Sequence, residues 1–163
     1  MKYQIKDLQS LFHQVFQDEY NITLEFGADE PFYYAAKNKS ERNILYCRED
    51  FFASALHEIA HWSLAGVERR KKDDYGFWYS PDGRDIEKQR EFERVEIKPQ
   101  AIEKAFSEAC NYPFKASVDN LSLENYDPSS FISNINKQFN LYKETRFPLR
   151  AQRFINALEQ FYS

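Results

Sequence analysis

The sequence of 163 residues has the length of a single domain with a buried core, and its net charge of −4 disfavours nucleic-acid binding, which requires a basic face. The N-terminus lacks the apolar run of a signal peptide, and no segment is apolar enough to span a membrane. We therefore expect residues 1–163 to form one cytoplasmic domain whose two cysteines are reduced and which contacts neither nucleic acid nor membrane.

The first part of the chain predicts one helix followed by short strands. Apolar residues recur at helical spacing over residues 5–16, which predicts an amphipathic helix of about four turns. Residues 22–26 alternate between apolar and polar side chains and end at Gly27, a pattern typical of a strand. Residues 32–35 and 43–47 flank a polar turn, so they predict a hairpin.

The most informative segment contains two of the three histidines. His57 and His61 stand four residues apart, with Glu58 directly after the first. Residues four apart lie on one face of a helix, so both imidazoles can reach one ion, and Glu58 lies about 100° round the same helix. Flanking apolar residues at helical spacing predict that helix, with Asp50 as N-cap and Gly66 just past its end. Because neutral imidazole binds zinc, iron, copper or nickel, the motif predicts a mononuclear metal site.

The chain after this motif predicts mainly helices. Aromatic residues 75–79 suggest a strand, and residues 81–83 have strong turn chemistry. Helical patterns then span residues 86–111, 128–144 and 148–162. Pro99 lies inside the first of these and is expected to kink or divide it. Short strands among helices indicate an α+β fold that is mainly helical with a small sheet.

A catalytic metal site needs a third protein ligand and an open position. His13 is a weak candidate, since an isolated histidine on an amphipathic helix is more often a surface or packing residue. Glu96 falls at the edge of an apolar stripe that includes Val95, whereas Glu93 falls further toward solvent. A core-facing carboxylate is costly to bury unless a cation pairs with it. We therefore predict Glu96 as the third ligand and keep Glu93 as the alternative.

Several blocks of the sequence together resemble the elongation factor P hydroxylase family. The main blocks are residues 51–62, 79–85 and 92–101. Shorter similarities follow at residues 112–114, 117–121 and 153–155. The combination covers most of the chain and is far more specific than the histidine motif alone.

The resemblance implies a bacterial enzyme that uses molecular oxygen to hydroxylate the lysylated lysine of elongation factor P, a translation factor. It implies a zincin-like HExxH helix and a metal held by His57, His61 and Glu96, with iron(II) as the expected metal and zinc as the alternative. Glu58 is the expected catalytic residue, handling a proton or fixing a bound water. No sequence feature requires a 2-oxoglutarate co-substrate, although Arg84 could bind its carboxylate.

The same ligand set supports two rival functions. With zinc bound and Glu58 as general base, the chain would be an HExxH metallopeptidase. The ligand set alone does not choose between the two reactions, and without the resemblance the peptidase would be favoured. A non-enzymatic alternative is a metal-stabilised domain that binds translation components. Structural zinc sites generally use four ligands rich in cysteine, and neither Cys47 nor Cys110 lies near the motif in the sequence. The resemblance places the hydroxylase first.

Overall fold

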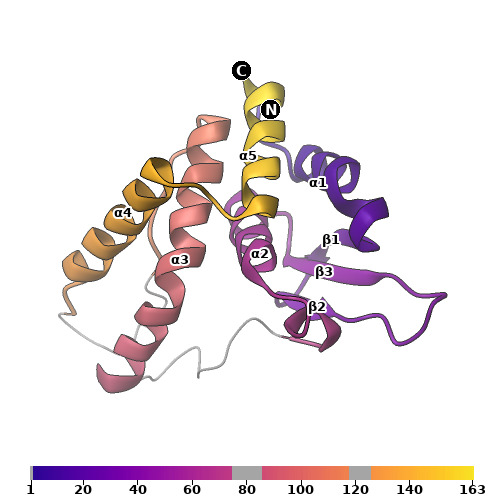
Figure 1. The fold of residues 1–163 in the computed structure, drawn as a ribbon, viewed down its shortest axis with the longest axis horizontal. Helices are drawn as coiled ribbons and strands as arrows, with labels where there is room; N and C mark the ends of the chain where they lie inside the picture. The colour runs from indigo at the N-terminus through magenta and orange to yellow at the C-terminus, as the bar shows by residue number, and fades with distance from the viewer. Residues whose placement is uncertain (1, 75–85, 118–125) are drawn as a thin grey trace.

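In the computed structural model, which describes residues 2–74, 86–117 and 126–163, the amphipathic N-terminal segment forms helix α1 (Ile5–Tyr20). The predicted opening helix is confirmed, and its 16 residues agree with the expected length of about four turns. It ends at Asn21 in the left-handed conformation, with φ at 49°, which asparagine tolerates better than most residues. The chain then enters strand β1 (Ile22–Ala28) directly, so that α1 folds back along the sheet (Figure 1).

The sheet contains three strands in the order β1-β3-β2. The predicted hairpin is confirmed: β2 (Phe32–Tyr34) pairs antiparallel with β3 (Asn43–Arg48). Strand β3 also pairs parallel with β1, and this long-range pairing is not apparent in the sequence. The central strand buries Leu45 and Cys47 on the face that packs against the next helix.

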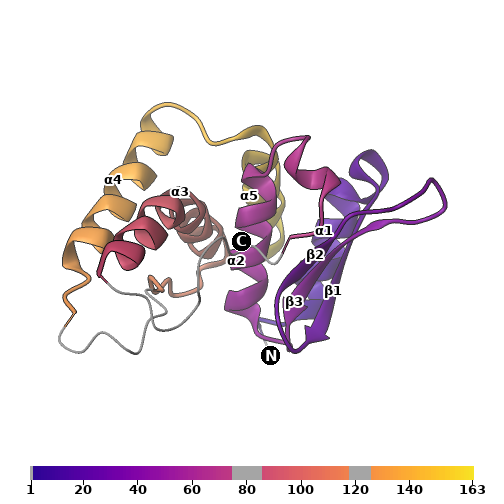
Figure 2. The same cartoon turned by 90° about the horizontal axis from the view of Figure 1, so that it is seen from below.

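Helix α2 (Phe52–Leu64) carries the histidine motif, as predicted. The predicted N-cap is wrong, because Phe51 occupies that position and no side chain caps the helix. Asp50 lies one residue too early to reach the first free N–H groups. Figure 2 shows α2 between the sheet on one side and α3 on the other.

Two arginines cap the C-terminal end of α2. Gly66 lies just past that end, as predicted, but it does not adopt the left-handed conformation of a glycine terminator. Instead, Arg70 donates to the carbonyl of Ala65 at 2.7 Å, and Arg150 donates to the carbonyls of Trp62 and Ala65 at 2.6 and 2.5 Å. Cationic side chains at this end also complement the helix dipole.

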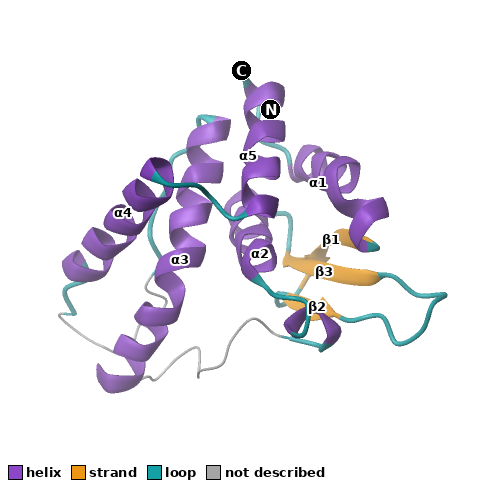
Figure 3. Cartoon of the chain, in the orientation of Figure 1, coloured by secondary structure: helices purple, strands orange, loops and turns teal. Residues whose placement is uncertain are grey.

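The remaining helices match the predicted patterns, and the helices together form most of the described structure (Figure 3). A short 3-10 turn, η1 (Arg69–Lys71), follows α2, and the predicted aromatic strand and turn at residues 75–83 lie outside the described residues. Helix α3 (Ile86–Cys110) continues through Pro99 without dividing. Helices α4 (Ser129–Glu144) and α5 (Leu149–Tyr162) pack on α3, and α5 also contacts α1 and α2. No helix in these ranges is long and apolar enough to cross a membrane.

An aromatic cluster joins α5 to its neighbours. Phe154 of α5 is fully buried, and its ring centroid lies 5.2 Å from that of Phe106 on α3 and 6.1 Å from that of Phe16 on α1. Trp62 of α2 packs on Phe16 from the other side, at 4.9 Å. The cluster therefore joins α5 directly to α1 and α3, and it reaches α2, which carries the histidines, through the contact of Phe16 with Trp62.

Replacing Phe154 with alanine is expected to lower the free energy of unfolding by about 3–5 kcal/mol, because it leaves a cavity between three helices. Urea denaturation followed by circular dichroism measures the loss. Phe161→Ala on the same helix is the control, since Phe161 is half exposed and its loss should cost about 0.5 kcal/mol or less. Equal losses for the two variants would contradict this assignment of the core.

Candidate metal centre

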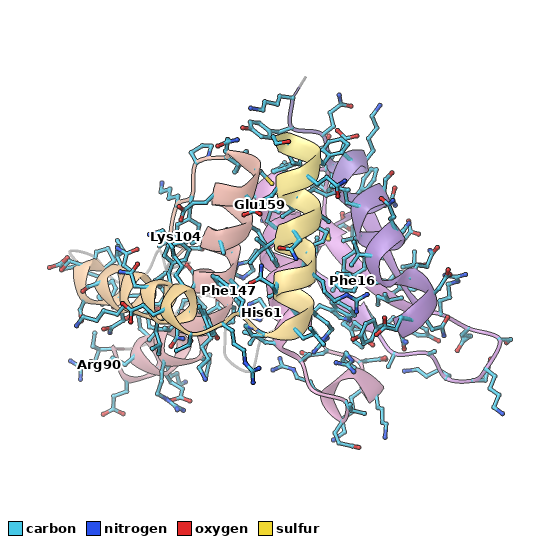
Figure 4. The ribbon with its side chains drawn as sticks, turned by 45° about the horizontal axis from the view of Figure 1, so that its top comes forward. Phe16, His61, Arg90, Lys104, Phe147 and Glu159 are labelled. Carbon is cyan, nitrogen blue, oxygen red and sulfur yellow. The ribbon has the colours of Figure 1, made fainter. Side chains whose placement is uncertain are left out.

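Three predicted ligand side chains converge between α2 and α3. His61 Nε2 lies 2.8 Å from Glu96 Oε2 and 3.1 Å from His57 Nε2. His57 Nε2 lies 3.4 Å from Glu96 Oε1. In Figure 4 the label of His61 stands between the ribbons of α3 and α5, and its partner Glu96 belongs to α3. The sequence prediction of Glu96 as the third member of this group agrees with the structure, which brings all three donors within 4.8 Å of one another.

The donor atoms of this cluster fit a single metal ion. Glu96 is 2% exposed, and its Oε2 has no hydrogen-bond partner among the described residues, although His61 Nε2 is close. The Nε2 atoms of His57 and His61 face each other, and they cannot both donate a hydrogen bond to one another. A tetrahedral ion with bonds of about 2.0–2.2 Å would hold its ligand atoms about 3.3–3.6 Å apart, close to the spacing observed. A cation would therefore satisfy atoms that the protein leaves without partners.

The charges of the cluster also favour a bound cation. Burial alone would lower the pKa of His57, but the carboxylates of Glu103 and Glu96 outweigh it and raise that pKa to about 10. Burial alone would raise the pKa of Glu96, but His61 and His57 lower it to about 2. The carboxylates thus favour positive charge at the imidazoles, and a divalent cation would supply it in place of protons.

Glu103 is a residue of this site that the sequence did not lead us to expect. Its Oε1 accepts a hydrogen bond from His57 Nδ1 at 2.6 Å. This bond places the proton of the imidazole on Nδ1 and leaves the lone pair of Nε2 directed at the cluster. The sequence contained a signal for it: Glu103 follows Glu96 by seven residues, so both lie on one face of α3 two turns apart.

Gln100 holds Glu96 in a similar way. Its side-chain Nε2 donates to Glu96 Oε1 at 3.2 Å and to the carbonyl of Ser117 at 2.8 Å. Its Oε1 accepts from the backbone N–H of Ser117 at 3.0 Å. The amide is therefore fixed at both ends, and it orients the carboxylate that faces the two histidines.

These residues belong to a buried polar stripe that runs the length of α3. The spacing between successive members alternates between four and three residues. The members are Gln89, Glu93, Glu96, Gln100, Glu103 and Ser107. The prediction that Glu93 faces solvent is wrong, because it is 9% exposed and accepts hydrogen bonds from Gln89 and Tyr126. Val95 is 38% exposed and lies outside the buried face. The prediction erred by taking the apolar residues alone as the core side of this helix.

Glu58 is the neighbour of His57 in the sequence, but its carboxylate oxygens are not among the donor atoms that converge in the cluster. It is buried, at 6% exposure, and lines a cavity together with His61. Burial raises the pKa of Glu58, and the nearby His57 and His61 partly oppose that rise. The position is compatible with the catalytic role expected from the sequence, which stays a prediction.

Two further sequence candidates lie elsewhere. His13 is half-buried, and its Nε2 accepts a hydrogen bond at 2.9 Å from the backbone N–H of Leu24. It joins α1 to β1, so the expectation of a packing residue is confirmed. Arg84, considered for a 2-oxoglutarate carboxylate, lies outside the described residues.

Glu103→Gln is expected to weaken binding of a divalent metal by about 10-fold to 100-fold, because the charged partner of His57 Nδ1 is lost. Competition with a chromogenic chelator measures the dissociation constant. Glu108→Gln is the matched control, an exposed glutamate on the same helix. An unchanged affinity in the Glu103 variant would show that the carboxylate does not orient the histidine.

Glu96→Gln should weaken metal binding by more than about 100-fold, since loss of a direct ligand exceeds loss of a residue that only orients one. Glu93→Gln should retain the affinity within a few fold, because Glu93 lies outside the cluster. The same chelator assay compares them. The reverse ranking would make Glu93 the ligand.

Comparison with known proteins agrees with this site. The sequence profile of the elongation factor P hydroxylase family matches residues 11–163, which include the histidine helix and all of α3. Over all 163 residues the chain is 44% identical to the elongation factor P lysine hydroxylase of Haemophilus influenzae, and the aligned region covers 92% of that protein. The chain belongs to the elongation factor P hydroxylase family.

Proposed function

We propose that this chain hydroxylates the lysylated lysine residue of elongation factor P. The observation that carries the proposal is the full-length relationship to an elongation factor P lysine hydroxylase, combined with the convergence of His57, His61 and Glu96 at one point. The reaction takes place in the cytoplasm, where translation factors act.

We propose iron(II) as the metal. Two histidines and one carboxylate with open positions are the ligand set of non-haem iron oxygenases. Bound at His57, His61 and Glu96, iron(II) would supply the oxidation of an unactivated C–H bond by molecular oxygen. Insertion of one oxygen atom also consumes two electrons from a reductant and releases the second atom as water.

The protein's own residues have separable roles in this proposal. Glu103 keeps Nε2 of His57 available as a ligand, and Gln100 fixes the carboxylate of Glu96. Glu58 is the proposed catalytic residue, because it lines the cavity that His61 also lines. From there it can contact the substrate or hold a proton during the reaction.

The proposal predicts that lysylated elongation factor P gains one oxygen atom when incubated with this protein, iron(II), ascorbate and air. Intact-mass spectrometry detects the gain, and ¹⁸O₂ gas should label the added atom. His57→Ala should abolish the gain, since it removes a ligand. His13→Gln is the control and should retain it.

An unchanged mass with the iron-loaded protein would contradict the proposed function. A shortened elongation factor P, produced with zinc alone, would instead establish the metallopeptidase. Parallel reactions with and without 2-oxoglutarate determine whether the enzyme needs that co-substrate.

A further inference from the structure

Three arginines gather where the end of α1, the end of α2 and the start of α5 meet. Arg70 and Arg150 both donate to the carbonyl of Ala65, at 2.7 and 2.5 Å. The guanidinium carbons of Arg70, Arg150 and Arg153 lie 5.4, 5.7 and 6.0 Å from the ring centroid of Tyr20. Three half-buried cations therefore surround one aromatic side chain.

This group of cations is only partly neutralised. Arg153 pairs with Glu19 at 3.2 Å, but Arg70 and Arg150 form no ion pair with a carboxylate in the described ranges. Burial and the nearby Arg70 lower the pKa of Arg150 to about 10. The dipole of α2 offsets part of the charge. Lys72, which ends the adjoining 3-10 turn, is exposed and has no ion-pair partner in these ranges either. An excess of positive charge therefore remains here.

The other acidic residues of the neighbouring segment are already paired. The pairs are Glu68 with Lys71, Asp73 with Lys37 and Asp74 with Arg69. Carboxylates interspersed among the cations disfavour a row of phosphates, which would approach both. A protein surface can instead place its own carboxylates against the unpaired cations alone.

Two apolar side chains next to these cations are exposed. Leu149, which precedes Arg150, is 72% exposed, and Val67 is 60% exposed. These are the largest exposed fractions among the large apolar residues that the structure describes. Because Arg150 binds the carbonyl of Ala65, the two side chains belong to adjoining segments. Exposed apolar residues with charged neighbours are typical of a protein-binding surface.

We call Arg70, Arg150, Lys72, Val67 and Leu149 the junction face. This face borders the candidate metal centre. Arg70 lines the cavity that His61 also lines, and the backbone N–H of Ala65 donates to the carbonyl of His61 at 3.1 Å. A protein bound over the junction face therefore lies close to the metal cluster.

We propose that the junction face docks the protein substrate through an acidic surface with an apolar residue at its centre. Carboxylates of the partner would pair with Arg70 and Arg150, and its apolar residue would cover Leu149. The identity of the partner, elongation factor P, rests on the proposed function, whereas docking itself can be measured without turnover.

The binding test titrates fluorescently labelled, lysylated elongation factor P with the zinc-loaded full chain and follows anisotropy. The double variant Val67→Ser/Leu149→Ser should weaken binding about 10-fold or more, because it removes the apolar centre of the interface. Lys72→Glu should weaken it about 3-fold to 10-fold at low salt and much less at high salt, since salt screens exposed charges. Arg70 and Arg150 stay unchanged because they also cap α2.

Leu141→Ser and Lys137→Glu are the matched controls and should keep the wild-type affinity. Both residues are exposed and belong to α4, which packs on α3. Figures 1 and 2 show α4 on the opposite side of the molecule from α1 and the sheet. Circular dichroism and the chelator assay establish that each variant keeps its fold and its metal site.

Steady-state oxygen addition provides the second measurement. The junction-face variants should raise KM for elongation factor P by the same factors and leave kcat unchanged. Oxygen addition with an unchanged KM would overturn this inference alone. Salt-sensitive binding that the variants lose, without oxygen addition, would support the docking face and count only against the proposed function.

Two further results would also overturn the inference. One is an unchanged affinity for elongation factor P in both junction-face variants. The other is tighter binding of the chain to a single-stranded RNA oligonucleotide or to phosphatidylserine vesicles, lost in Lys72→Glu, than to elongation factor P.

Discussion

The interaction on which the structure depends is the contact between α2 and the buried polar stripe of α3. Glu96 and Glu103 both approach His57, and Glu96 also approaches His61, inside a domain that otherwise packs through apolar and aromatic side chains. Burying two carboxylates costs free energy unless positive charge accompanies them. A metal ion held by His57, His61 and Glu96 would supply that charge, so the arrangement that would bind the metal is also one that a cation would stabilise.

The rest of the fold holds α2 in place for this contact. The sheet supports one side of the helix, and α5 covers another, where Arg150 bonds to the carbonyl of Trp62 and lies over its ring. The two arginines at the C-terminal end of α2 replace the glycine cap that the sequence suggests. Because Arg150 reaches the helix from α5, the position of the histidines depends on residues almost ninety positions away in the chain.

Local features of the sequence were enough to predict the helices, the hairpin and the grouping of Glu96 with the two histidines. They failed where a residue's role depends on a distant partner. The apolar residues of α3 place Glu93 toward solvent, but the helix also has a buried polar face, on which Glu93 bonds to Gln89 and Tyr126. The parallel pairing of β1 with β3 and the orienting role of Glu103 likewise arise only when separate elements pack together.

The central claim is that His57, His61 and Glu96 bind one iron ion. Anomalous diffraction at the iron absorption edge, from crystals grown without oxygen in the presence of iron(II), tests it most directly. The expected result is a single peak about 2.0–2.2 Å from the Nε2 atoms of the two histidines and from a carboxylate oxygen of Glu96. A peak held by Glu58 or Glu93 instead, or no peak at the cluster, would contradict the claim.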